Sequence, residues 1–214
     1  MNRPRTGIFA TLLGLAAGLV SAGLHAHEFW VEPSAFTIER GGRIGLRLCV
    51  GDGFDGWSLA RNTGRIERFV AAGPSGELPI VGLDGSDPAG VARFTVPGGY
   101  VIAYRSNRAF TELPAAEFEE YLRDKGLEKI ATRGEARGTS RRKVREAYSR
   151  HSKALIRVGA ANGSVIDRPM NLRLELVAEP GLFRAPPDDL RFFRLLHDGK
   201  PLAGALVTAA RPGT

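Results

Sequence analysis

The chain has 214 residues, 43% of them hydrophobic, and a formal net charge of +7. This length and composition suffice to bury one core and to begin a second. A single cysteine, Cys49, excludes an internal disulfide framework.

Residues 1–26 have the three parts of a secretory signal peptide. Arg3 and Arg5 give a positive start, an uncharged apolar run covers 7–20, and small residues follow. The apolar run is too short for a transmembrane helix, which needs about 20 apolar residues. The sequence therefore predicts export to a bacterial periplasm, and a mature protein that is soluble and does not span the membrane.

Two cleavage sites are compatible with this signal, and each leaves a histidine near a free amino terminus. Cleavage after Ala22 gives Gly-Leu-His, where His25 stands third and can form a square-planar set with the amine and two backbone amides. Cleavage after Ala26 exposes His27, whose amine and ring nitrogen can chelate together. Both geometries suit divalent transition metals such as Cu(II) or Ni(II).

The positive charge is concentrated in residues 133–153, which carry a net +6. The segment has two acidic residues and eight basic ones: Arg133, Arg137, Arg141, Arg142, Lys143, Arg145, Arg150 and Lys153. One interpretation is a solvated helical face, and the other is a patch for anionic lipid or an acidic partner. Export argues against nucleic acid.

From Phe29 to about Asn107 the pattern is one of short strands separated by turn residues, typical of a β-sandwich. In residues 43–50 the apolar side chains alternate, which places Cys49 on the opposite face with Arg47 and predicts a quiet, partly covered thiol. Alternating residues on both sides of Pro97-Gly98-Gly99 predict a hairpin over 92–104.

The period then changes to that of helices. Pro114 begins a predicted helix that Gly126 ends, and a second helix is predicted from Ser140 to His151. Strands return at 154–158 and 172–177. The predicted fold is therefore mostly β: an immunoglobulin-like β-sandwich over 27–180 with a helical insertion at about 114–151.

A linker is predicted at 181–189, followed by a second small β module at 190–214. Its predicted strands are Leu190–Leu196 and Ala205–Ala210, joined by a turn at Asp198-Gly199-Lys200-Pro201. An isolated hairpin is marginal in water. The hairpin is therefore either the start of an incomplete module or a segment that docks on the first domain.

Catalytic motifs are not found in this sequence. It has no Gly-x-Ser-x-Gly elbow and no phosphate-binding glycine loop, and its four histidines lack zinc-motif spacing. We therefore expect no enzyme. The candidate metal ligands are His27, His25 and, if the fold brings it near, His151; His197 is expected to face solvent.

Several segments together resemble one exported family, once labelled NikM-like or nickel-uptake substrate-specific and now largely held as a domain of unknown function. The resemblance rests on 27–33 (HEFWVEP), 118–122 (FEEYL), 126–127 (GL), 145–150 (REAYSR), 153–159 (KALIRVG) and 198–205 (DGKPLAGA). It implies a periplasmic, β-rich protein, sometimes associated with nickel or cobalt uptake. The last segment also looks like the start of a carboxypeptidase-regulatory-like module, and the histidine after the signal favours cleavage before His27.

The leading hypothesis is a non-enzymatic periplasmic protein that binds Ni, Co or Cu as a divalent ion and assists its uptake or handling. Its partner would be an envelope protein or a metal transporter. The alternative is a structural or interaction β module of the cell envelope.

Overall fold

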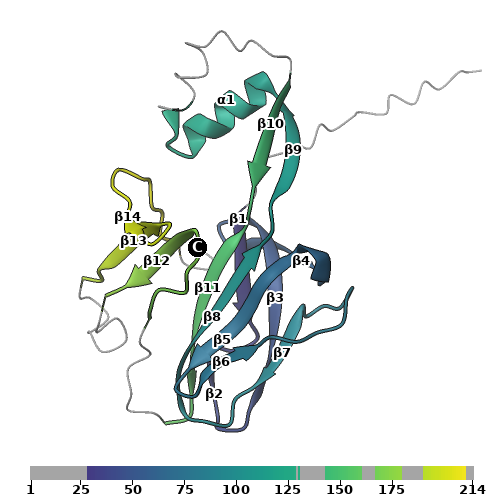
Figure 1. Ribbon diagram of the computed structural model, residues 1–214, viewed down its shortest axis with the longest axis vertical. Coiled ribbons are helices and arrows are strands. Elements are labelled where there is room, and N and C mark those ends of the chain that lie inside the picture. Colours follow the sequence, from purple (N-terminus) through teal and green to yellow (C-terminus); the bar gives the residue numbers. More distant parts are fainter. Residues whose placement is uncertain (1–27, 129, 131–142, 161–166, 180–189, 211–214) are drawn as a thin grey trace, which may run out of the picture.

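The computed structural model describes residues 28–128, 130, 143–160, 167–179 and 190–210. The signal segment, His25 and His27 lie outside these residues. Figure 1 shows a β-sandwich, a long arm that leaves one end of it, and a smaller sheet beside it. No helix in the described part of the chain is long and apolar enough to cross a membrane.

The first sheet of the sandwich has the order β1-β3-β4, with β7 also paired to β3, and all its pairs are antiparallel. Its strands are β1 (Glu28–Pro33), β3 (Arg43–Asp52), β4 (Asp55–Leu59) and β7 (Gly90–Arg93). A short 3₁₀ helix, Thr63–Arg65, follows β4 and leads into the second sheet.

The second sheet has the order β2-β11-β8-β5-β6 and is antiparallel except for the β2–β11 pair. Its strands are β2 (Thr37–Ile38), β5 (Ile66–Gly73), β6 (Gly76–Pro79), β8 (Gly98–Ser106) and β11 (His151–Val158). The predicted sandwich over the first part of the chain is thus confirmed.

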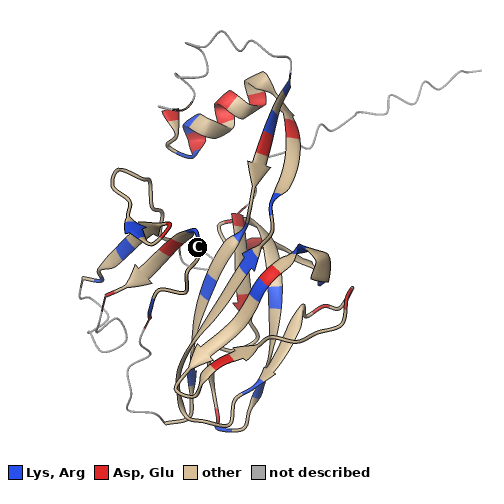
Figure 2. Cartoon of the chain, in the orientation of Figure 1, with Lys and Arg blue, Asp and Glu red and all other residues tan. Residues whose placement is uncertain are grey.

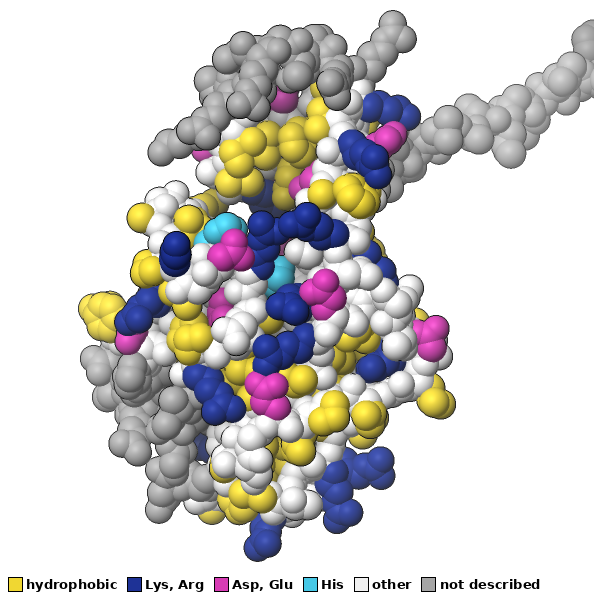
Figure 3. All heavy atoms as spheres, in the orientation of Figure 1, with side chains coloured by type: hydrophobic (Ala, Val, Ile, Leu, Met, Phe, Trp, Pro, Cys, Tyr) yellow, Lys and Arg dark blue, Asp and Glu magenta, His cyan; other side chains and the backbone are white. Residues whose placement is uncertain are grey.

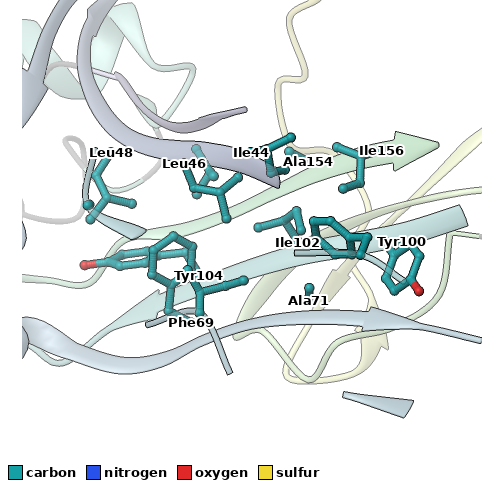
Figure 4. Packing of buried hydrophobic residues seen from close by; sticks show 14 of the residues in the cluster. Ile44, Leu46, Leu48, Phe69, Ala71, Tyr100, Ile102, Tyr104, Ala154 and Ile156 are labelled. Carbon is teal, nitrogen blue, oxygen red and sulfur yellow. The ribbon is translucent and has the colours of Figure 1, made fainter. Parts of the chain in front are cut away.

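The core lies between these sheets and follows from alternation along the strands. Figure 4 shows side chains of β3 packed against those of β8 and β11: Ile44, Leu46, Leu48, Tyr100, Ile102, Tyr104, Ala154 and Ile156. The other face of β8 is also buried, because Val101 and Ala103 pack with Met170 and Leu172 in a second cluster. The central strand β8 is therefore covered on both sides.

The predicted hairpin over 92–104 is wrong. β7 pairs with β3 in the first sheet, whereas β8 pairs with β5 and β11 in the second. Between β7 and β8 the chain crosses from one sheet to the other at the edge of the core, where Phe94 is fully buried. Gly98, with a φ of 149°, then turns the chain into β8. Alternation shows that both segments are strands but does not specify their partners.

The arm consists of β9 (Ala109–Pro114), α1 (Ala115–Asp124) and β10 (Lys143–Tyr148). The first predicted helix is confirmed, with Pro114 at its N-cap and Gly126 in the left-handed conformation after its end. The helix packs weakly on the two strands, which pair with each other in antiparallel register.

The second predicted helix, Ser140–His151, is wrong over its described residues. Residues 143–148 form β10, and His151 begins β11. The side chains of β10 alternate between exposed and half-buried, and the strand pairs with β9 from Lys143 to Tyr148. Pairing with a distant strand has overridden the local helical pattern here. A solvated helical face is therefore excluded for residues 143–153.

The third sheet contains β12 (Leu174–Ala178), β13 (Phe193–His197) and β14 (Lys200–Pro201). β12 pairs with β13, although the segment predicted as a linker (181–189) separates the two strands in the sequence. The predicted turn at 198–201 forms the β13–β14 hairpin, and β13 covers most of the predicted strand at 190–196. The predicted strand at 205–210 is wrong: these residues are irregular and exposed, with no partner strand among the described residues.

Candidate functional site

The first described strand begins directly after His27. Glu28 opens β1 opposite Gly51, and its carboxylate accepts a hydrogen bond from the backbone N–H of Gly53 (3.1 Å). The ring of Phe29 packs against that of Tyr104, with 5.0 Å between centroids, and the Arg150 guanidinium lies 5.1 Å above it. The strand that carries the predicted chelating terminus is therefore firmly attached to the sandwich.

A small cavity of about 260 Å³ adjoins this strand. Phe29, Tyr104 and Tyr148 supply its aromatic wall, and Arg65 and Arg150 its positive charge. Arg150 also lies over the Tyr148 ring, at 5.8 Å, so part of the predicted basic segment is engaged in cation–π contacts.

His151 begins β11 in the second sheet and lies on the face of that sheet that is turned away from β1. Its neighbour Ser152 accepts a hydrogen bond from the backbone N–H of Val31 (2.9 Å), and Ala154 and Ile156 follow it into the sandwich core. Side chains alternate along a strand, so His151 and Lys153 point away from β1. The structure therefore does not bring His151 to the face on which β1 begins.

The imidazole of His151 lines a groove of about 430 Å³ between the sandwich, the base of the arm and the third sheet. Its Nε2 lies 3.0 Å from Ser149 Oγ, and its Nδ1 is buried with no partner among the described residues. Burial, and then the positive charges of Arg105 and Arg173, lower the pKa of His151. Its surroundings consequently favour the neutral form of the ring.

The charge of the groove is positive. Arg105, Arg108 and Arg173 line it, against two acidic residues, Glu67 and Asp198. Figure 2 shows basic residues where the arm joins the sandwich, and in Figure 3 they gather with the histidines across the middle of this face. Basic residues outnumber acidic ones in this lining, so its net positive charge repels a bare divalent cation. This environment favours an anion over the metal ion for which His151 was a candidate.

The remaining residues singled out in the sequence are inert or exposed. Cys49 is buried and its thiol contacts Glu32 Oε2 (3.2 Å). Burial and the Glu32 hydrogen bond raise the pKa of Cys49 to about 12, which confirms a quiet thiol. The side chain of His197 is 49% exposed, as predicted. No three His, Cys, Asp or Glu side chains in the described ranges are grouped so as to hold a metal ion.

The groove itself was not predicted from the sequence. Its arginines come from β8, from the loop before β9 and from the segment before β12, at positions 105, 108 and 173. Each is an ordinary surface residue in its local context, so the sequence offers no spacing that would join them.

Comparison with protein families gives a match over nearly the whole chain. The model of a family described as "Domain of unknown function (DUF4198)" matches residues 24–214, nearly the whole chain. The chain belongs to this family. No curated protein and no solved structure matches the chain significantly. Membership in the DUF4198 family therefore agrees with the domain-of-unknown-function resemblance and carries no nickel assignment.

Proposed function

We propose that this DUF4198 protein is exported to the periplasm and binds Ni(II), Co(II) or Cu(II) at its mature amino terminus. It would assist uptake or handling of the metal, with a metal transporter or another envelope protein as its partner, and would not catalyse a reaction. Residues 1–26 direct export in this proposal, and the ligands are the terminal amine and a histidine.

The observation that carries the proposal is the attachment of β1 immediately after His27. Phe29 is packed between Tyr104 and Arg150, and Glu28 is paired with Gly51. A chelating residue next to an ordered strand loses less conformational freedom on binding than one on a free tail. Cleavage before His27 would thus place the amine and the imidazole one residue before an ordered strand.

The alternative cleavage, before Gly23, would also create a chelating amino terminus, with His25 in place of His27 as the ligand. His25 then stands third and can complete a square-planar set with the amine and two amides. His151 faces away from β1 in a basic groove, so we assign it no part in this site.

Intact mass of the secreted protein, with and without Ni(II) or Cu(II), tests the proposal. The mass identifies the first residue and the bound metal together.

If His27 is first, His27→Ala and an added alanine before His27 should each abolish binding, because the first removes the ring and the second displaces the amine. His151→Ala and His197→Ala are matched controls and should bind as the parent does. No retention of metal at micromolar concentration by correctly processed protein contradicts the proposal.

A specific observation also favours the interaction module as a second candidate. The register of β12 and β13 places Leu174, Leu176 and Phe193 on one face, and all three are exposed. Exposed apolar patches on a folded protein commonly mark interaction sites. The double substitution of Leu174 and Phe193 to serine should reduce crosslinking to an envelope protein in intact cells. Leu83→Ser, at an exposed residue of the sandwich, is the control.

A further inference from the structure

The groove that His151 lines contains more arginines than acidic residues, so its charge is not fully balanced. Arg105 Nε lies 2.8 Å from Glu67 Oε2, and Arg173 Nε lies 3.6 Å from Asp198 Oδ1. Arg108 has no acidic partner among the described residues. The groove therefore has one guanidinium group without an acidic partner among the described residues and two others that are each paired with one carboxylate.

Arg108 is held in place through its backbone. Its carbonyl oxygen accepts a hydrogen bond from Arg65 (3.1 Å), and the preceding Asn107 donates to the Gly64 carbonyl (2.7 Å). Its side chain therefore lines the groove from an ordered loop. Because the loop is already ordered, binding a ligand there costs less conformational entropy.

Neutral polar groups complete the lining. Ser149 Oγ lies 3.0 Å from Nε2 of His151 and donates to it or accepts from it according to the ring tautomer. Nδ1 is buried without a partner among the described residues, a state that costs free energy. A ligand in the groove can supply the missing partner: an oxygen acceptor where Nδ1 is protonated, and a hydroxyl donor where it is not.

The lining also restricts the shape of the ligand. None of the described residues that line the groove is Phe, Tyr or Trp, so it offers no surface on which a nucleobase could stack. Its volume of about 430 Å³ lies at the lower end of small-molecule sites. Guanidinium groups pair with carboxylate and phosphate oxygens.

We propose that this groove binds a small, non-aromatic polyanion with two or more carboxylate or phosphate groups. One anionic group would contact Arg108 and a second Arg173 and Arg105, with His151 and Ser149 as neutral neighbours. Glu67 and Asp198 compete with the ligand for the arginines they pair with. The site lies on the opposite face of the sheet from β1, so it is separate from the amino-terminal site proposed above.

Isothermal titration calorimetry on the intact protein tests this with citrate and pyrophosphate as probes and acetate as the single-charge comparison. We expect citrate or pyrophosphate to bind at micromolar to low millimolar concentration and acetate to bind much more weakly. The probe that binds more tightly shows whether the groove prefers carboxylate (citrate) or phosphate (pyrophosphate) groups. Binding should weaken as salt is raised, because charge pairs are screened.

Variants of the groove residues should change the affinity for the polyanion in opposite directions, which distinguishes a role in binding from a role in folding. Arg108→Ala and Arg173→Ala should each weaken binding by about tenfold, the loss of one charged hydrogen-bonding group. Asp198→Asn and Glu67→Gln should tighten it, because each frees an arginine. Asn also tolerates the positive φ of Asp198 (48°). Arg157→Ala, at an exposed site on β11, is the control and should bind as the parent does.

Three results would overturn the proposal: no binding of either polyanion, acetate binding as tightly as both, or weaker binding in the Asp198→Asn and Glu67→Gln variants. Circular dichroism spectra of the arginine variants check that they are folded. His27→Ala should leave polyanion binding unchanged, so failure of the metal proposal and failure of this one are distinguishable.

Discussion

The ammonium group of Lys153 lies 2.6 Å from Asp167 Oδ1, and the two side chains are only 10% and 6% exposed. Lys153 belongs to β11 of the sandwich, whereas Asp167 precedes the third sheet. A second carboxylate, that of Glu175 on β12, lies 3.1 Å from the same ammonium group. This buried ion cluster attaches the third sheet to the sandwich.

The cluster also shapes the groove. Glu175 accepts hydrogen bonds from the backbone N–H groups of Met170 (2.6 Å) and Leu172 (3.2 Å). The chain between them turns at Asn171, whose φ of 58° is one that asparagine tolerates. Arg173 follows this turn at the groove. The ion cluster therefore positions one wall of the proposed anion site.

Lys153→Met should strongly destabilise the protein, because it leaves two buried carboxylates without their cation. The exposed side-chain fractions of Lys153, Asp167 and Glu175 are 10%, 6% and 2%. Removing one partner of such a pair lowers the free energy of unfolding by about 3–5 kcal/mol. Urea denaturation measures the loss, and Arg157→Met on the same strand should change stability little. Equal losses in the two variants would contradict the assignment.

His151 makes stability depend on pH. Its pKa in the folded protein is lowered from 6.5, so the unfolded chain binds more protons as pH falls below about that value. The free energy of unfolding should therefore decrease as pH falls from 7 to 5. His151→Gln should make this decrease shallower in urea denaturation at several pH values, whereas His197→Gln should leave it unchanged. A slope unaffected by His151→Gln would show that the ring titrates normally in the folded state.

Cys49 should react very slowly with thiol reagents in the folded protein. With a pKa of about 12, only about one thiol in ten thousand is ionised at pH 8, and the side chain is buried besides. Reaction with Ellman's reagent should become fast and complete in denaturing urea. Burial is the main cause of this high pKa, and the Glu32 carboxylate adds to it, so Glu32→Gln should speed the reaction. Fast labelling of the folded parent protein would contradict the burial of this thiol.

Gly73→Ala should destabilise the sandwich without touching either proposed site. A Cβ atom at position 73 would collide with the ring of Tyr100. That ring cannot move aside easily, since Tyr100 donates a hydrogen bond to the Val96 carbonyl (2.8 Å) and packs on Phe94. Overpacking of this kind costs about 1–3 kcal/mol. Thermal denaturation compares it with Gly64→Ala, where the new Cβ would meet only Asn62 Oδ1 at 3.4 Å and should be tolerated.

Features that depend on neighbouring residues could be predicted from the sequence. Alternation in β3 located a buried face and placed Cys49 on the other one, because side chains of a strand project to opposite sides. Pro114 and Gly126 marked the ends of α1, because each has a backbone preference suited to one end of a helix.

The pairing of strands and the contacts between distant side chains depend on the folded core and could not be predicted from local patterns. β7 and β8 were recognisable as strands, yet their separation into two sheets depends on how the whole core closes. β10 became a strand because β9 lies alongside it. The groove combines Arg105, Arg108 and Arg173 from segments far apart in the chain, so these residues line one groove only when the third sheet docks on the sandwich.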